Sequence, residues 1–246
     1  ASDVYKRQNE CFKIESNQKK YFIKTNSSFN PFNEEKKGLK LLESTNTFTI
    51  PKVYEVGVEK KTAFLLMEFI DGKIPSDDFW ISFGYKLAKM HSHSNKFFGL
   101  DHNNYIGSLS QENTQHLDAI EFFINCRLLP QIRLISKSSN NQLFKRFDKL
   151  FSKLSEIFPN DKPALIHGDL WNGNFMVDTS GTPVLVDPAV YYGSREIDIA
   201  MSKLFGGFSN KFYEGYNEKF PLENGWQYRV DTVSYTHLTL PTILLV

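Results

Sequence analysis

The stretch LIHGDLWNGNFMVDTSGTPVLVDPA, residues 165–189, decides the fold of this chain because its apolar runs and polar residues alternate in a definite order. The apolar run that ends at Ile166 predicts a short strand, and two further runs on either side of Gly181 predict a hairpin. The loop between strand and hairpin ends at Asn174, and Asp187 follows the second hairpin strand. We therefore expect Asn174 and Asp187 to lie close together at the open end of the hairpin.

Three polar residues of this stretch, Asp169, Asn174 and Asp187, have the order and spacing of a phosphoryl-transfer site. A carboxylate and an amide oxygen are hard ligands that suit Mg²⁺, which commonly uses one or two protein carboxylates together with substrate phosphates. Asp169 is then available to accept a proton from an attacking hydroxyl, as the first Asp of D-x-x-x-x-N does in kinases. The structural alternative is that these residues only form turns or cap helices.

Near the start of the chain, two short strands are predicted over 11–15 and 20–24, and Lys24 closes the second one. A lysine in this early strand of a kinase contacts the ATP phosphates and pairs with a glutamate of the following helix. We choose Glu35 as that partner, in a helix that Asn33 is expected to cap. The structural alternative for Lys24 is a solvated charge at a sheet edge.

A second hairpin is predicted over 52–59 and 62–70, and its last strand runs into a linker with a glycine. This is what a hinge between two lobes requires, because its backbone amides can meet the edge of an adenine. The residues predicted to bind ATP there are Met67, Glu68, Phe69 and Ile70. A buried strand followed by a turn has the same composition, and the sequence does not choose between the two interpretations.

From Ser76 onward the apolar spacing becomes helical, and the first helix is expected to end near His91. His91 and the histidine two residues later do not share a helix face, so we interpret them as a helix end and not as metal ligands. Two further helices are predicted over 117–128 and 143–157. The first of these should end before Pro130 or kink there.

Glu196 and Asp198 open another apolar helix, where acidic side chains favour the positive end of the helix dipole. We also expect Asp198 to support the catalytic loop structurally, through hydrogen bonds to the loop backbone.

The order of these elements predicts an α+β, two-lobed fold with a small β-rich N-lobe over 9–70 and a larger, mainly helical C-lobe over 71–231. The two ends, 1–8 and 232–246, differ in composition from the body. We predict that they are non-native, a scar and a tail. The alternative is that they are native, loosely docked termini.

Composition narrows the classes of partner. The chain has 246 residues, 41% hydrophobic, and a net charge of +1 from 29 basic and 28 acidic residues. This balance argues against nucleic acid or an anionic membrane surface as a partner. Two cysteines, Cys11 and Cys126, have no paired spacing, and no membrane span or signal peptide is recognised, so we expect a reducing cytoplasm. The oligomeric state is not predicted.

Five motifs together resemble the fructosamine kinase family, a branch of the aminoglycoside phosphotransferase-like, protein-kinase-like fold. The resemblance extends over about residues 10–231. The motifs are FGLDHNNYIGSL (98–109), HGDLWNGN (167–174), DPAVYYGSREIDIAM (187–201), LFGGF (204–208) and FYEGYNEKFPL (212–222).

The resemblance implies ATP-dependent phosphorylation of ketosamines, free or protein-bound sugar adducts of amines, at the sugar 3-hydroxyl as a deglycation step. It implies that Asp169 is the base and that Mg²⁺ is held by Asn174 and Asp187. Lys24 would contact phosphate with Glu35 as its partner, and the hinge residues Met67 to Ile70 would meet the adenine.

Two residues of the loop are assigned to the substrate. Trp171 would stack on the apolar face of the sugar, with a packing role as the alternative, and His167 is predicted to bind substrate.

The chain departs from the family pattern at its start, because residues 1–8 contain no glycine where the family has a glycine-bearing phosphate loop. The family's last helices are also missing after residue 231. Two other hypotheses therefore stay open. The chain could phosphorylate another small hydroxylated molecule, such as an amino sugar, choline or a nucleoside, or it could be an inactive member that only binds ligands.

Overall fold

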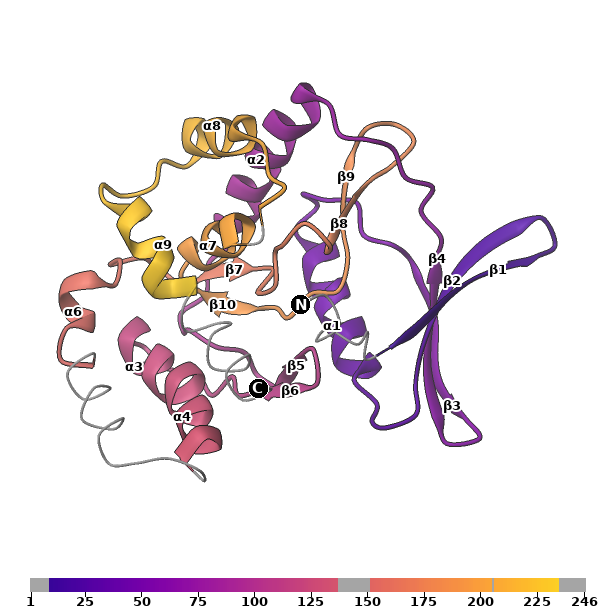
Figure 1. The fold of residues 1–246 in the computed structure, drawn as a ribbon, viewed down its shortest axis with the longest axis horizontal. Coiled ribbons are helices and arrows are strands. Elements are labelled where there is room, and N and C mark those ends of the chain that lie inside the picture. The colour runs from indigo at the N-terminus through magenta and orange to yellow at the C-terminus, as the bar shows by residue number, and fades with distance from the viewer. Residues whose placement is uncertain (1–8, 137–150, 205, 235–246) are drawn as a thin grey trace.

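The computed structural model describes residues 9–136, 151–204 and 206–234. Within them the chain forms an α+β fold with a strand-rich N-terminal part and a larger, mainly helical part (Figure 1). The predicted fold class is confirmed. Residues 1–8 and 235–246 lie outside the described residues, and the last described helix extends to Ser234, beyond the predicted boundary at 231.

The N-lobe is an antiparallel sheet in the order β1-β2-β4-β3, joined to one helix. Its elements are β1 (Glu10–Ser16), β2 (Lys19–Asn26), α1 (Phe32–Ser44), β3 (Val53–Glu59) and β4 (Thr62–Glu68). Alternate residues of β4, among them Leu65 and Met67, are buried and pack with Phe32 and Leu39 of α1. The period-2 pattern of the sequence therefore buries one sheet face against α1.

Helix α1 starts one residue earlier than its predicted cap. Asn33 lies inside the first turn, Pro31 occupies the cap position without a side-chain hydrogen bond, and the Phe32 N–H donates to Asn30 Oδ1 at 3.2 Å. The prediction that Asn33 caps this helix is wrong, because the Asn30-Pro31 pair already begins the turn.

The C-lobe elements begin with α2 (Asp77–His91), β5 (Asn104–Ile106), β6 (Leu109–Gln111), α3 (Ala119–Phe123), η1 (Ile124–Leu128), α4 (Leu129–Ser136) and α6 (Leu154–Ile157). They continue with β7 (Ala164–Ile166), β8 (Phe175–Val177), β9 (Pro183–Leu185), β10 (Tyr191–Gly193), α7 (Glu196–Leu204), α8 (Asn210–Lys219) and α9 (Trp226–Ser234). None of the helices in the described ranges is long and apolar enough to cross a membrane.

Helix α2 is the central element of the C-lobe core. Ser76 caps it by accepting a hydrogen bond from the Phe79 N–H at 3.2 Å, as the sequence predicts. Helix α8 packs closely along it, because glycines face the opposite backbone: a Cβ on Gly84 would lie 2.2 Å from the Phe212 carbonyl oxygen, and one on Gly215 would lie 2.6 Å from the Ile81 carbonyl oxygen. This close approach brings the end of α2 against α8 (Figure 1).

The helical segment does not end at Pro130. Segment η1, a π-helix, precedes it, and α4 continues to Ser136. Proline has no N–H for the carbonyl four residues earlier, that of Cys126. Instead, the Arg127 Nη1 donates to this carbonyl at 2.9 Å, so the oxygen that Pro130 leaves without a backbone donor is satisfied. The wider π turn is a common feature of functional or strained helix segments.

Two details of the predicted helices differ. Leu117, expected in the apolar stripe, lies before the cap residue Asp118 and is 68% exposed. Of the second predicted helix, α6 supplies Leu154 to the core, whereas Leu143, Phe147 and Leu150 lie outside the described residues.

Candidate active site

The loop of residues 167–174, for which the sequence predicts the catalytic role, connects β7 to β8 as predicted and is called the catalytic loop below. Asn174 folds back on the loop, and its Nδ2 donates to the Asp169 carbonyl at 2.8 Å and to Asp169 Oδ2 at 2.9 Å. The Asp169 carboxylate is thereby held at the loop tip while remaining partly exposed. Burial raises the pKa of Asp169 to about 7. The Asn174 hydrogen bond acts in the opposite direction and lowers the pKa, whereas the charges of Asp187 and Asp198 raise it further.

The loop needs a glycine at its start. Gly168 has φ +81°, and a Cβ there would lie 2.1 Å from the Ala189 carbonyl oxygen. The catalytic loop therefore lies directly against the segment that follows Asp187, and the His167 carbonyl accepts the Ala189 N–H at 2.9 Å. Asp187 itself has φ +54°, in the left-handed region that a non-glycine residue rarely adopts outside special sites.

The N-lobe contributes a buried ion pair. Lys24 Nζ donates to Glu35 Oε1 at 2.7 Å, and it also contacts Asp187 Oδ1. The side chains of Lys24 and Glu35 are 4% and 12% exposed, whereas Asp187 is 45% exposed. Burial opposes a charged lysine, but the two carboxylates outweigh it and raise the pKa of Lys24, so the ammonium persists.

These contacts bring together residues from three parts of the sequence. The edge-charge alternative for Lys24 does not fit its burial, since the residue pairs with β4 on its other side. Helix α1 also docks on the segment after Asp187, because a Cβ on Gly38 would lie 3.3 Å from the side chains of Pro188 and Val190.

The residues predicted to hold a cation have suitable chemistry. Asn174 uses its NH₂ group for both contacts with Asp169, so its carbonyl oxygen takes part in neither. Asp187 adds an exposed carboxylate. In the described part of the chain no three His, Cys, Asp or Glu side chains gather to bind a metal. One amide oxygen with one carboxylate fits Mg²⁺ that takes its other ligands from water and phosphate.

His167 differs from its prediction. It is fully buried, its Nε2 lies 2.9 Å from the Val186 carbonyl, and its Nδ1 lies 3.3 Å from the Asp169 N–H. Burial lowers the pKa of His167, so the neutral ring donates to Val186 and accepts from Asp169. The prediction that His167 binds substrate is therefore wrong: the side chain instead connects the backbone beside Asp169 to the backbone beside Asp187.

Asp198, the third residue of α7, lies beneath the loop and is fully buried. Its Oδ2 accepts the His167 N–H at 2.7 Å, and its Oδ1 accepts the Gly168 N–H at 2.9 Å. Burial alone would raise the pKa of Asp198, but the hydrogen bonds from the His91 side chain and from the His167 N–H outweigh it and lower the pKa. The structure thus contains the backbone hydrogen bonds that the sequence predicts for Asp198.

Trp171 lies partly exposed within the loop, and its ring covers Gly173, where a Cβ would lie 2.4 Å from the indole. This contact agrees with a packing role and leaves part of the ring accessible. Gly207 has φ +90° and lies against the Asn172 side chain. A Cβ added to Gly207 would lie 2.6 Å from Asn172 Cγ. The LFGGF motif therefore touches the catalytic loop, a role that its sequence alone did not indicate.

The predicted hinge residues follow the end of β4. The Glu68 N–H donates to the Lys52 carbonyl at 2.8 Å, so this amide is already bonded within the sheet. Met67 is buried in the sheet opposite Phe22. Phe69 and Ile70 lie after the strand and are half-buried, so an adenine edge would meet the backbone there.

A buried polar network supports the segment after Asp187 and was missed by sequence reasoning. Gln111 Nε2 donates to the Ala189 carbonyl at 3.1 Å, and Asn104 Nδ2 donates to the Val190 carbonyl at 2.8 Å. Asn113 joins Asn104 to Arg127 through hydrogen bonds of 2.8 Å. The only sequence signal was the polar FGLDHNNYIGSL stretch, interpreted as an ordered loop.

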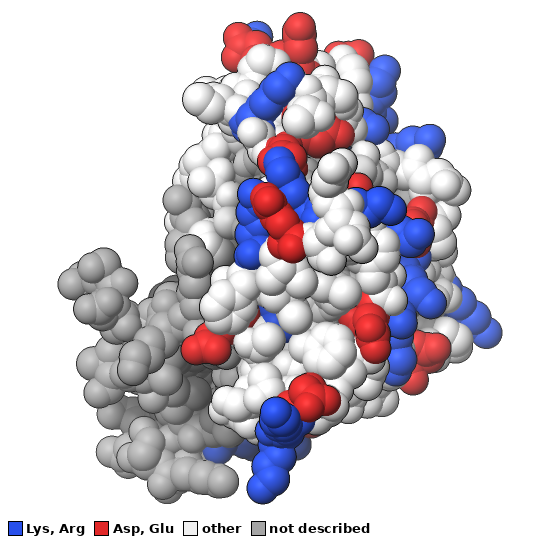
Figure 2. Space-filling model, turned by 90° about the vertical axis from the view of Figure 1, so that its right-hand side faces the viewer, with Lys and Arg blue, Asp and Glu red and all other residues white. Residues whose placement is uncertain are grey.

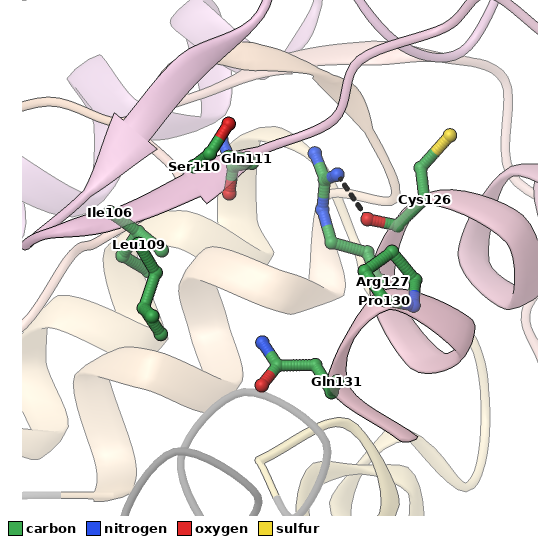
Figure 3. A pocket seen from close by; sticks show the side chains of 8 residues that line it. All are labelled: Ile106, Leu109, Ser110, Gln111, Cys126, Arg127, Pro130 and Gln131. Carbon is green, nitrogen blue, oxygen red and sulfur yellow. Dashed lines mark hydrogen bonds between the residues drawn. The ribbon is translucent and has the colours of Figure 1, made fainter. Parts of the chain in front are cut away.

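Figure 3 shows this region from close by. Gln111 and Arg127 line a small pocket between the β5–β6 hairpin and segment η1, together with Pro130 and Gln131. Asp169, Asn174 and Asp187 do not line it. Charges elsewhere are mixed: on the face in Figure 2, Lys and Arg lie among Asp and Glu, in agreement with the balanced composition.

Comparisons with known proteins agree on one family. The sequence model described as "Fructosamine kinase" matches residues 6–240. The "Probable ketoamine kinase" of Vibrio vulnificus is 36% identical over 237 residues, 94% of this chain and 81% of that protein. The chloroplastic "Protein-ribulosamine 3-kinase" of Oryza sativa subsp. japonica is 36% identical over 236 residues, 93% of this chain and 68% of that protein.

Solved structures give the same result. The crystal structure of "Putative fructosamine-3-kinase" from Haemophilus somnus superposes with a TM-score of 0.86 at 30% identity, covering 96% of this chain and 81% of that one. A thermostable mutant of the aminoglycoside phosphotransferase APH(4)-Ia, in its apo form, superposes with a TM-score of 0.65 at 12% identity, covering 97% of this chain and 83% of that one. At that identity the second likeness shows the fold alone.

Proposed function

This chain belongs to the fructosamine kinase family, and we propose that it transfers the γ-phosphoryl group of ATP to the 3-hydroxyl of a ketosamine. The observation that carries this proposal is the juxtaposition of the Asp169 carboxylate, held by Asn174, with Asp187 held by Lys24. The names of the relatives, ketoamine kinase and ribulosamine 3-kinase, support a sugar–amine adduct as substrate. Phosphorylation of such an adduct would serve deglycation.

Asp169 has the position of a general base. The substrate hydroxyl oxygen bonds to the γ-phosphorus while the bond from phosphorus to the bridging oxygen of ADP breaks. Asp169 accepts the hydroxyl proton as the new bond forms. A pKa near 7 suits a base that must be ionised at neutral pH and still accept a proton effectively. The bond from Asn174 to Oδ2 fixes the carboxylate direction.

Lys24 has the position of a phosphate contact. Its ammonium is charged and buried beside Glu35, and it lies next to Asp187 in the structure described here. We propose that ATP phosphates bind at this ammonium and that the adenine meets the backbone of Phe69 and Ile70.

Asn174 and Asp187 are the residues that would hold Mg²⁺. A bound Mg²⁺ would neutralise the negative charge on the transferred phosphoryl group and on the leaving ADP. The left-handed backbone at Asp187 directs the hairpin end toward Lys24, so the same carboxylate serves the cation site and the lysine contact.

We propose a cytoplasmic location, since Cys126 is a buried thiol whose Sγ contacts the Thr114 carbonyl and is not part of a disulfide.

A substrate panel tests the proposal. ADP release is measured with ribulose-lysine, fructose-lysine, an aminoglycoside and choline, with free lysine as the amine lacking a sugar and Asp169→Asn as the blank. We expect turnover of the ketosamines alone. Turnover of the aminoglycoside or choline with the ketosamines untouched would assign the chain to another substrate class. Failure to bind ATP would favour the alternative of an inactive family member that only binds other ligands.

A further inference from the structure

The last residue of α2, His91, is buried and forms its hydrogen bonds with Tyr216 and with Asp198, the residue that binds the backbone of the catalytic loop. Its side chain has no exposed surface. Nδ1 lies 2.8 Å from the Tyr216 hydroxyl of α8, and Nε2 lies 3.2 Å from Asp198 Oδ2 of α7. Three helices therefore meet at one imidazole, and the close α2–α8 packing through Gly84 and Gly215 brings them within reach.

The direction of the hydrogen bond between His91 and Asp198 follows from the partners. Asp198 Oδ2 already accepts the His167 N–H and, as a carboxylate oxygen, has no proton to donate, so His91 Nε2 must donate to it. Nδ1 and the Tyr216 hydroxyl share the second hydrogen bond of the ring, at 2.8 Å. Tyr216, His91 and Asp198 therefore form one continuous chain of hydrogen bonds.

Asp198 is bonded on both oxygens by the catalytic loop. Oδ2 takes the His167 N–H and Oδ1 takes the Gly168 N–H, the two amides before Asp169. A carboxylate that rotates about its χ2 bond cannot keep both contacts. His91 adds a second donor to Oδ2, and this donor is fixed by Tyr216.

We propose that His91 and Tyr216 are positioning residues for phosphoryl transfer, because they fix the rotation of Asp198 and through it the backbone on which Asp169 stands. The proposal rests on the proposed phosphotransferase function. Neither residue touches substrate or the reacting atoms. Their effect is on orientation, to which transfer reactions are sensitive even when the displacement is small.

The chain contains a matched control on the same helix. Tyr213 lies one turn before Tyr216 on α8, and its hydroxyl lies 3.1 Å from Ser202 Oγ of α7. Both tyrosines connect α8 to a neighbouring helix through their hydroxyl groups; Tyr213 is half-buried and Tyr216 is buried. Its partner is Ser202 near the end of α7, and among the described residues no hydrogen bond leads from this serine to the catalytic loop. Tyr213→Phe therefore removes a comparable hydroxyl outside the Asp198 network.

The experiment compares His91→Leu, His91→Gln, Tyr216→Phe and Tyr213→Phe. The first readout is hydrogen exchange of the peptide 165–170, which needs no substrate. Exchange at this peptide should speed up in His91→Leu and in Tyr216→Phe but not in Tyr213→Phe. His91→Gln, whose amide can still donate to Asp198, should restore most of the protection.

The second readout is kinetic, on whichever substrate the wild type accepts. His91→Leu should lower kcat by about 10- to 100-fold, the range for losing an orienting hydrogen bond behind a functional ligand, with KM for ATP nearly unchanged. His91→Gln should recover most of the rate, and Tyr216→Phe should show a smaller loss than His91→Leu.

Specific outcomes overturn the proposal. A folded His91→Leu with wild-type exchange at 165–170 removes it, and so does equal acceleration of that exchange by Tyr213→Phe and Tyr216→Phe. If His91→Leu does not fold, the two tyrosine variants decide alone. Because exchange is measured without substrate, an error in the ketosamine assignment changes the kinetic readout only.

Discussion

Lys24 and Asp187 are separated by 163 positions in the sequence, yet the lysine ammonium contacts the aspartate carboxylate and also donates to Glu35 at 2.7 Å. One buried cation thus joins the N-lobe sheet, helix α1 and the end of the catalytic hairpin. Removing one partner of this ion pair should destabilise the fold, because it leaves a buried charge without compensation.

The first prediction concerns Lys24. Lys24→Met should abolish the phosphate contact and raise KM for ATP by at least about tenfold, since a charge-assisted contact contributes about 1.5–3 kcal/mol. It should also destabilise the fold by up to about 3–5 kcal/mol, because Glu35 stays buried without a partner. Steady-state kinetics and urea denaturation measure the two effects.

Lys37→Met is the matched control. Lys37 pairs with Glu34 on the exposed side of α1 at 3.5 Å, and exposed pairs contribute only about 0–1 kcal/mol. Its KM and stability should stay near those of the wild type. Similar behaviour of the two variants would show that the Lys24 contacts contribute nothing specific.

The second prediction concerns the base. Asp169→Asn should lower kcat by about 10² to 10⁴ and leave KM for ATP nearly unchanged, because proton acceptance acts in the transition state. Asp178→Asn serves as control: Asp178 Oδ1 accepts the Ser180 and Thr182 N–H groups at 2.8 Å in the hairpin turn. That variant should lower Tm but keep its rate. A wild-type rate in Asp169→Asn would exclude Asp169 as base.

The third prediction is a dependence of stability on pH. Burial raises the pKa of Asp169 to about 7 in the fold, whereas an unfolded Asp titrates near 3.8. Between these values the folded state binds more protons than the unfolded state, so the free energy of unfolding falls as pH rises through this window. Asp169→Asn cannot ionise and does not show this loss.

The measurement is Tm of both proteins from about pH 5 to about pH 8, without divalent cations. The Tm of Asp169→Asn relative to the wild type should increase up to about pH 7 and level off above it. A difference that stays constant with pH would mean that Asp169 titrates as an ordinary surface carboxyl.

The fourth prediction concerns the cation. With ATP present, Mg²⁺ should raise the Tm of the wild type, since a ligand that binds only the folded state stabilises it by mass action. Asp187→Asn and Asn174→Ala should lose the Mg²⁺-dependent part of this increase, and kcat of Asp187→Asn should fall at least as far as that of Asp169→Asn. An unchanged Mg²⁺ response in both variants would remove the cation assignment.

The fifth prediction concerns the network behind the hairpin. Gln111→Leu removes the donor to the Ala189 carbonyl and should cost about 1–3 kcal/mol, the usual effect of an unsatisfied buried acceptor. Gln131→Leu changes the same pocket, but Gln131 Oε1 has no partner among the described residues, so its loss should be neutral or stabilising. Equal destabilisation by both would contradict this account of Gln111.

The order and spacing of residues in HGDLWNGN and DPA carried most of the prediction, because a strand, a loop and a hairpin leave few ways to place Asp169, Asn174 and Asp187. Lys24 and Glu35 also met as expected, since the two short β strands and the following helix allow little else. These contacts depend on local chain geometry, which the sequence pattern encodes directly.

Other features depend on packing that no local pattern reveals. A histidine two residues before Asp169 suggests contact with substrate, but the His167 ring is buried and bonds to the Val186 carbonyl and to the Asp169 N–H. The sequence predicted only a helix end at His91. Its hydrogen bond with Tyr216 depends on the close packing of α2 and α8 through Gly84 and Gly215. At the π turn before Pro130, Arg127 Nη1 donates to the Cys126 carbonyl, a contact that no local pattern predicts.

The most direct test of the central claim is identification of the product formed from ribulose-lysine and ATP with Mg²⁺. The mass should increase by one phosphoryl group, and phosphorus–carbon coupling in the NMR spectrum should place it on the sugar 3-hydroxyl, with no product from Asp169→Asn. Unmodified ribulose-lysine in the presence of the folded, ATP-binding protein would contradict the account.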